Sequence, residues 1–181
     1  MQIAEMILVI FIFCSIIGII GLVYYNRFEE LKVYINEAEL NIDDCLRKKF
    51  DIMNRLVNVI NGNVDDGNKK FDDFTKLKGK KLANYEMDRK LVECAIVFYD
   101  VADKHKELKK VANYTKLIKE LEKNEEKLIA AKDYYNACIT KHNRLVRLFP
   151  SNLIAIFQKY SEKTFFDGKN MYDEIYNDFQ V

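Results

Sequence analysis

Apolar residues recur at alternating intervals of three and four between Val111 and Phe149. This spacing keeps one face of an α-helix turned towards a partner, so it predicts one long helix with a packed seam. The seam positions are Val111, Tyr114, Ile118, Leu121, Glu125, Leu128, Lys132, Tyr135, Ile139, His142, Val146 and Phe149. Glu125, Lys132 and His142 are the polar members, and a charge on a packed seam is unfavourable unless it is paired. The pattern therefore predicts that these residues specify register, a partner or a site.

A similar seam precedes it and predicts a first long helix. Its members are Leu31, Ile35, Ala38, Ile42, Cys45, Lys49, Ile52, Leu56 and Val59. Lys49 is the one charged member. The pattern stops at residues 61–68, which are dense in Asn, Asp and Gly and indicate a turn.

The same turn has some features of a calcium-binding loop. Asn61, Asn63 and Asp65 alternate, but the glycine is at Gly67, one place late for an EF-hand, and the twelfth position is Asp72 instead of Glu. We therefore expect a helix-connecting turn without calcium.

The remaining elements are less regular. A second helix has Phe71 and Phe74 as a candidate start and is interrupted by a glycine-containing basic patch. From Leu82 its apolar face resumes with Tyr85, Val92, Ile96 and Tyr99, which we expect to turn inward. The basic patch at 76–81 favours a solvated face over the alternative of a contact with anionic lipid or an acidic partner. Pro150 is expected to end the third helix, because proline disfavours helical geometry in the residue before it. Ser151 or Asn152 then caps a shorter fourth helix that includes Leu153, Ile156, Phe157 and Tyr160.

These patterns predict an all-α protein with an N-terminal transmembrane helix, followed by an antiparallel up-and-down bundle of three long helices plus a shorter fourth. One proline and six glycines in the whole chain agree with a mostly helical fold. The expected organisation is an anchor at 1–25, a bundle at 26–160, and an aromatic and acidic tail at 161–181 that either packs back or stays mobile.

In this topology the first and third helices run in the same direction. At about 1.5 Å per residue, Lys49 lies roughly 35 Å beyond the anchor, whereas Glu125 and Lys132 lie roughly 26 and 36 Å along the third helix. We therefore predict a buried polar layer of Lys49, Glu125, Lys132 and Asn136, with Arg47 as a further candidate.

The stretch from Met6 to Tyr25 carries no charge and is rich in Ile, Val, Leu and Phe. Its length of roughly 30 Å matches a bilayer core. A cleaved signal peptide and a lipid-modified Cys14 are weaker alternatives, because no cation precedes the stretch and bulky residues precede Cys14. The positive-inside tendency, with Arg27 and Lys32 after the stretch, favours a short external N-terminus and a cytoplasmic helical domain in the cell membrane.

Cysteine usage and net charge narrow the function classes. Cys45, Cys94 and Cys138 are far apart, with no CxxC pair, which fits a reducing compartment and gives no zinc motif. The formal net charge is +1, with 29 basic and 28 acidic residues, so nothing indicates a nucleic-acid partner.

Several blocks of the chain match a known pattern. Tyr25-Asn26 is similar to an opening YN, and residues 46–57 are similar to LxRRxDLIPNLV. The residues from Glu125 to Ala155 are similar to ExxIxxARxxYNxxVxxYNxxxxxFPsNxxA. With these blocks the chain resembles the LemA family of bacterial membrane-anchored helical proteins, from the anchor to about Phe166.

The chain also departs from the family pattern. Asn54 and Arg55 replace the Pro-Asn of PNLV, and residues 105–109 lack the aromatic and proline of YPxLK. Lys132 and His142 stand where the pattern has Arg and Tyr. The resemblance implies a single-pass membrane protein with a small external N-terminus and a helical bundle, and it implies no established catalytic activity.

The leading hypothesis is a membrane-tethered scaffold or adaptor that contacts lipid through residues 6–25 and offers a helical surface to protein partners. One alternative is a homo-oligomer whose seams face sister chains. Another is an enzyme or metal protein with a core site around Asp51, Glu125, Lys132 and His142. No ExxH, GxxxxGK, HExxH or GxSxG pattern occurs, so we expect no catalytic residue, no cofactor and no metal site.

Overall fold

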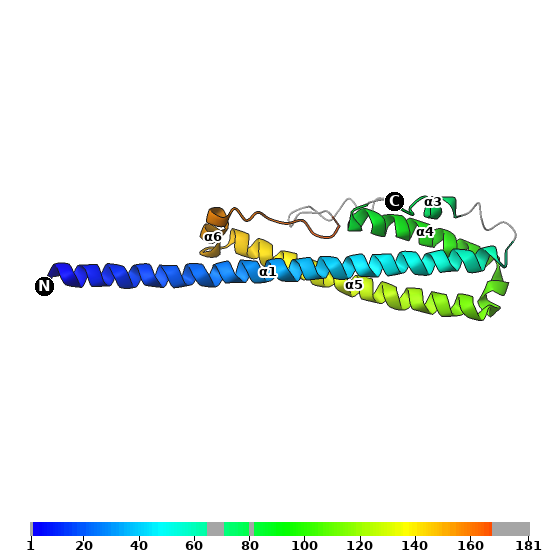
Figure 1. Cartoon of the computed structure of the whole chain (residues 1–181), viewed down its shortest axis with the longest axis horizontal. Coiled ribbons are helices and arrows are strands. Elements are labelled where there is room, and N and C mark those ends of the chain that lie inside the picture. Colours follow the sequence, from blue (N-terminus) through cyan, green and yellow to red (C-terminus); the bar gives the residue numbers. More distant parts are fainter. Residues whose placement is uncertain (1, 65–70, 80–81, 168–181) are drawn as a thin grey trace. The chain divides into compact units, whose positions relative to one another are not determined.

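A computed structural model describes residues 2–64, 71–79 and 82–167 of the chain. These residues contain no strand. Their helices are α1 (Gln2–Asn61), α3 (Asp72–Thr75), α4 (Asn84–Lys104), the 3-10 helix η1 (Lys106–Lys110), α5 (Ala112–Arg147) and α6 (Ser151–Gln158) (Figure 1). The predicted all-α class, with a long apolar N-terminal helix followed by packed helices, is confirmed.

The chain divides into two compact units. The first unit contains the described residues up to 37 and from 135 onward, and the second unit is Ala38–Tyr134. Both α1 and α5 are continuous helices that contribute to each unit.

In the second unit, α5 runs antiparallel to α1. Arg55 Nη2 lies 3.1 Å from Glu120 Oε1, and Asn124 Nδ2 donates to the backbone oxygen of Cys45 at 2.9 Å. Residues with higher numbers on α1 therefore contact residues with lower numbers on α5. The expectation that the first and third helices run in the same direction is wrong.

α5 runs antiparallel to α1 because of the segment between α1 and α4. In the second unit, α4 starts beside the middle of α1, where Asn84 Nδ2 is 3.5 Å from the Glu39 oxygen, and α4 then runs in the same direction as α1 (Figure 1). We call residues 62–64, 71–79, 82 and 83, which lie between α1 and α4 in the part of the chain that the structure describes, the return segment. The sequence predicts a turn at the start of this segment, followed by Phe71 and Phe74 as a candidate start of the second helix.

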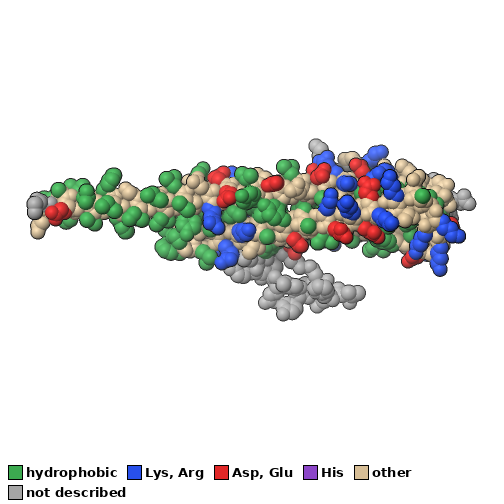
Figure 2. Space-filling view, turned by 90° about the horizontal axis from the view of Figure 1, so that it is seen from below, with side chains coloured by type: hydrophobic (Ala, Val, Ile, Leu, Met, Phe, Trp, Pro, Cys, Tyr) green, Lys and Arg blue, Asp and Glu red, His purple; other side chains and the backbone are tan. Residues whose placement is uncertain are grey.

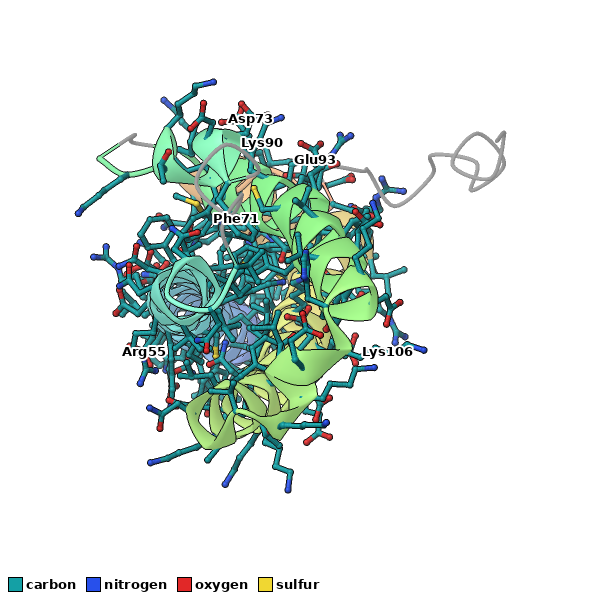
Figure 3. The ribbon with its side chains drawn as sticks, turned by 90° about the vertical axis from the view of Figure 1, so that its right-hand side faces the viewer. Arg55, Phe71, Asp73, Lys90, Glu93 and Lys106 are labelled. Carbon is teal, nitrogen blue, oxygen red and sulfur yellow. The ribbon has the colours of Figure 1, made fainter. Side chains whose placement is uncertain are left out.

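Aromatic packing holds the return segment in place. Phe71 and Phe98 have ring centroids 4.5 Å apart, and Phe74 stacks on Phe50 at 4.8 Å. Viewed from its end, the unit has Phe71 pointing inward, whereas Asp73 lies on the outside (Figure 3). Burying such rings is a large apolar contribution, which a short polar turn could not supply.

The calcium-like sequence and the basic patch both lie partly in this segment. Asp65 and Gly67 of the calcium-like sequence lie outside the described residues. In the basic patch, Lys76 is exposed and pairs with Asp73 at 3.1 Å, and residues 80 and 81 lie outside the described residues.

The expected inward face of α4 is wrong. Val92, Ile96 and Tyr99 are exposed, with relative accessibilities of 45%, 65% and 53%. The buried positions of α4 are Asp88, Leu91, Phe98, Val101 and Ala102. The contacts of Phe98 with the return segment fix the rotation of α4, and nothing in the local sequence of α4 announces those contacts.

In the first unit, α1 and α5 meet again. Ile35, Cys138 and Ile139 form a buried cluster, against which Tyr135 and Phe165 pack. The part of the tail up to residue 167 therefore folds back onto α5, and residues 168–181 lie outside the described residues.

The turn between α5 and α6 differs from the expected capping. α5 ends at Arg147, and α6 begins at Ser151 without a side-chain cap. The Ser151 hydroxyl donates to the Leu148 oxygen at 2.8 Å, and the Asn152 backbone N–H donates to the same oxygen at 2.9 Å. The two residues thus satisfy the end of α5 and do not cap α6.

Candidate functional site

Four charged side chains from three helices converge inside the second unit. Lys49 comes from α1, Asp88 from α4, and Glu125 and Lys132 from α5. We call these residues the charge quartet. Glu125 and Lys132 are seven residues apart, which places them two helical turns apart on one face, about 10 Å along α5.

Positively and negatively charged side chains alternate along the charge quartet. Lys49 Nζ lies 2.8 Å from Glu125 Oε2 and 4.0 Å from Asp88 Oδ1. Lys132 Nζ donates to Asp88 Oδ2 at 2.5 Å. Lys49 therefore contacts both the Glu125 carboxylate and the Asp88 carboxylate. Asp88 in turn binds Lys132, the next charged residue of the quartet on α5.

The two central members of the quartet are more buried than the two at its margin. The Lys49 and Asp88 side chains are 3% and 12% accessible, whereas those of Lys132 and Glu125 are 21% and 35% accessible. Two ammonium groups face two carboxylates, so the formal charges balance. Balance matters because an isolated buried charge is strongly unfavourable.

Sequence reasoning identified three members of the quartet and missed the fourth. Asp88 belongs to the run Asp88, Leu91, Ala95, Phe98 and Ala102. This run has the same three-four spacing as the seams of the other long helices, and Asp88 is its one charged member. That signal was present in the sequence but was masked by the larger residues Val92, Ile96 and Tyr99 on the neighbouring face.

The other polar-layer candidates take different partners. Asn136 belongs to the first unit, where its Oδ1 accepts from the Phe166 backbone N–H at 2.9 Å. Arg47 is on the surface of α1 and pairs with Asp43 at 2.8 Å. Neither residue is part of the quartet.

The residues of the enzyme hypothesis do not gather in one unit. His142 is in the first unit, where its ring lies edge to face with both Phe28 and Tyr160. Asp51 is exposed and, with Arg47, lines a pocket of about 610 Å³ between α1, the return segment and the start of α4. Among residues 2–64, 71–79 and 82–167, no group of three or more His, Cys, Asp or Glu side chains is arranged to hold a metal ion.

The cysteines of the second unit are poorly set up for nucleophilic chemistry. Burial raises the pKa of the Cys45 thiol, and it does the same for Cys94. A raised pKa keeps the thiol protonated, whereas the thiolate is the reactive form.

In the first unit, two asparagines of α5 clamp the chain that follows α6. Asn143 Nδ2 donates to the Lys163 oxygen at 2.7 Å, and Asn143 Oδ1 accepts from the Lys163 N–H at 2.9 Å. Asn136 makes the corresponding single bond to Phe166. Asn143 is 1% accessible, so its amide depends on these backbone partners.

The spacing of the asparagine clamp has a simple geometric basis. Asn136 and Asn143 are seven residues apart on a helix, which is about 10 Å. Lys163 and Phe166 are three residues apart, which is also about 10 Å in extended chain. Two asparagines at this interval therefore match the repeat of an extended segment lying along α5.

His142 lies beside Tyr160, which precedes the clamped segment. Phe28 meets the His142 ring edge to face at 5.8 Å and stacks on Tyr160 at 4.6 Å, and the Tyr160 hydroxyl donates to Glu29 Oε1 at 2.7 Å. Burial lowers the pKa of His142, opposed by its contact with Asn143. Burial and the Glu29 carboxylate raise the pKa of Tyr160 to about 12. Both rings are therefore held neutral.

Removing one charge from the quartet should be strongly destabilising. Lys49→Met leaves Glu125 and Asp88 without their shared cation, and we expect a loss of about 3–5 kcal/mol in the free energy of unfolding. The double variant Lys49→Met with Glu125→Leu removes a whole pair and should recover most of that loss. Urea unfolding of the full chain in detergent micelles, followed by circular dichroism, measures both.

The exposed pair of Arg55 and Glu120 supplies the control. Glu120→Gln should change the unfolding free energy by no more than about 1 kcal/mol, as for other exposed ion pairs. A loss for Lys49→Met as small as this would contradict a structural role for the quartet.

Acid should weaken the first unit through His142. Its native pKa is lowered, so protons bind more readily to the unfolded chain. The associated stability is present above the ordinary value of 6.5 and is lost as the pH falls from there towards the native pKa. In thermal unfolding between pH 8 and pH 5, His142→Tyr should show a smaller decrease than the wild type. His105→Gln, at the other histidine, should retain the wild-type decrease, and equal profiles for wild type and His142→Tyr would refute this assignment.

The model of the LemA family matches residues 38–176, which include the charge quartet, both clamp asparagines and α6. No curated protein matches the chain. The family match covers well over half of the sequence, and the chain therefore belongs to the LemA family.

Proposed function

We propose that this protein is a membrane-anchored helical scaffold or adaptor that has no catalytic role and binds protein partners. The supporting observation is an unburied apolar stripe on α4, in a unit whose interior charges are already matched. Val92, Ile96 and Tyr99 form this α4 stripe, at helical spacings of four and three. Apolar side chains grouped on one exposed helix face are typical of protein interaction surfaces.

The α4 stripe leads into a pocket between α4 and α5. Tyr99 lines both the stripe and this pocket of about 390 Å³, to which α5 contributes Tyr114 and Ile118. Charged residues at its margin include Asp103 and Lys109, which pair at 3.7 Å. An apolar floor with a charged rim suits the apolar face of an amphipathic helix from another protein.

The membrane anchor determines where in the cell this surface lies. The part of α1 up to residue 20 has no buried side chain, and α1 is long and apolar enough to cross a membrane. We propose that residues 6–25 span the cell membrane as a single pass. The buried charges of the quartet would then serve rigidity, since a scaffold must present its surface in a fixed form.

Crosslinking can test the α4 stripe directly. A photo-crosslinking amino acid at Ile96 should capture a defined protein in intact membranes, whereas the same group at the exposed Lys123 on α5 should not. Ile96→Asp should lower co-purification of that protein by about tenfold or more, because a charge in an apolar interface is unfavourable. The unfolding free energy should change by no more than about 0.5 kcal/mol, since Ile96 is exposed.

Each other outcome of that experiment is informative. No captured protein at Ile96 would count against the adaptor function. Capture of further copies of this chain alone would favour the homo-oligomer.

Orientation is tested separately. Arg27 and Lys32 follow the apolar stretch, so the helical units should lie in the cytoplasm. A tag at the C-terminus should resist external protease in intact cells and become sensitive once the membrane is opened. Digestion in intact cells would reverse the orientation.

A further inference from the structure

The short helix α6 carries its apolar side chains on the outside. Leu153, Ile156 and Phe157 are 49%, 71% and 84% accessible, and Phe149, just before the helix, is 78% accessible. The buried residues of α6 are small: Ser151 and Ala155 are each 2% accessible. At about 100° per residue these two sets lie on opposite sides of the helix. α6 is therefore turned with its small side towards the protein and its large apolar side away from it.

Contacts within the first unit place α6 next to the end of the apolar stretch of α1. A Cβ built on Gly21 would lie 3.7 Å from Ile154 Cδ1, so α6 packs directly on α1 at this position. Just beyond α6, Tyr160 is fastened to Phe28 and Glu29. The asparagine clamp holds the following residues. These attachments on both sides fix the level of α6 along α1.

That level corresponds to the edge of a bilayer. Gly21 precedes Tyr25, the last residue of the apolar stretch, by four residues, or about 6 Å along the helix. Interfacial helices sit about 5–10 Å deep, at the boundary of headgroups and acyl chains. Tyr24 and Tyr25 have the ring type that favours the same depth.

On the face that Figure 2 displays, hydrophobic side chains continue from the first part of α1 onto the region of α6. Beyond them, charged side chains become frequent. Arg144, in the last turn of α5, and Lys159, just after α6, are both exposed. The apolar surface of α6 is thus continuous with the surface that the bilayer would cover.

We propose that α6 is a second membrane contact, lying in the interface beside the anchor with Phe149, Leu153, Ile156 and Phe157 among the lipids. This inference rests on the proposed membrane span of residues 6–25. It assigns the occupant of the patch as lipid, in preference to a second copy of the chain. The anchor and α6 together would hold the first unit by two points, which limits its tilt and rotation against the membrane.

The sequence has no tryptophan, so single substitutions give unambiguous fluorescent probes. The probe variants are Phe157→Trp and Ile156→Trp on α6, Phe13→Trp in the anchor, and Leu40→Trp on the exposed surface of α1 beyond it. Each full-length variant is reconstituted into phosphatidylcholine vesicles that carry bromine at a shallow or a deep position of the acyl chain. Bromine quenches tryptophan only at close range, so the pattern reports depth.

Both α6 probes should show blue-shifted emission and stronger quenching by shallow than by deep bromine. The Phe13→Trp probe should be quenched most by deep bromine, and the Leu40→Trp probe should be unaffected. If the α6 probes behave like that at Leu40 while the anchor probe is quenched, α6 is not a membrane contact and the anchor stands. If the anchor probe is not quenched either, the proposed span itself fails.

A second copy of the chain on α6 would give a different result. The α6 probes would then be blue-shifted but insensitive to bromine, and their emission would change with the protein-to-lipid ratio. That outcome overturns the lipid contact. Circular dichroism of each variant checks that helix content is unchanged, which is expected because all four sites are exposed.

Discussion

The antiparallel contact between α1 and α5 is the constraint on which both units depend. In the second unit it aligns Lys49 with Glu125, and in the first it aligns Ile35 with Cys138 and Ile139. Everything else is added to this pair: α4 and the return segment cover it in one unit, and α6 with the clamped chain covers it in the other. Because α1 and α5 contribute to each unit, their register determines the contacts within each core.

Buried charge makes a change in this register unfavourable. Sliding α5 by one turn would move Glu125 away from Lys49 and would leave carboxylates and ammonium groups without partners in a poorly solvated space. Apolar contacts between helices tolerate sliding much better, because one aliphatic side chain can replace another. An alternating charge quartet contributes little to net stability compared with an apolar core, but it penalises wrong arrangements strongly. This property suits a protein that must present one fixed surface.

The first unit uses polar groups in another way. Asn136 and Asn143 bind the backbone at Phe166 and Lys163, so this attachment does not depend on the side chains of the segment that follows α6. The buried His142, Phe28 and Tyr160 rings complete the attachment. The result is a short helix that is held firmly through its small residues while its large apolar residues stay outside. A membrane protein can use such an arrangement at the lipid boundary, where an outward apolar face is an advantage.

The sequence by itself determined the elements that periodicity controls. The two long seams, the apolar stretch of α1, the all-α class and three members of the charge quartet follow from three-four spacing, because a helical repeat fixes which residues share a face. Lys49, Glu125 and Lys132 were assigned to one level on the assumption that the first and third helices are parallel. Lys49 and Glu125 meet although those helices are antiparallel, because each lies near the middle of its helix's part of the second unit, and Lys132 joins them through Asp88. That agreement was partly fortunate.

Only the tertiary structure decided the course of the chain and the rotation of α4. The direction of α4 depends on the return segment, and its rotation depends on Phe98 meeting Phe71 and Phe74. Such contacts join residues more than twenty positions apart, so no local pattern encodes them. Asp88 shares a three-four face with Phe98, but only the orientation of α4 shows that this face is the buried one, and only the contact of Asn136 with Phe166 separates Asn136 from the quartet. Periodicity identifies which residues share a helix face, whereas long-range packing selects what that face meets.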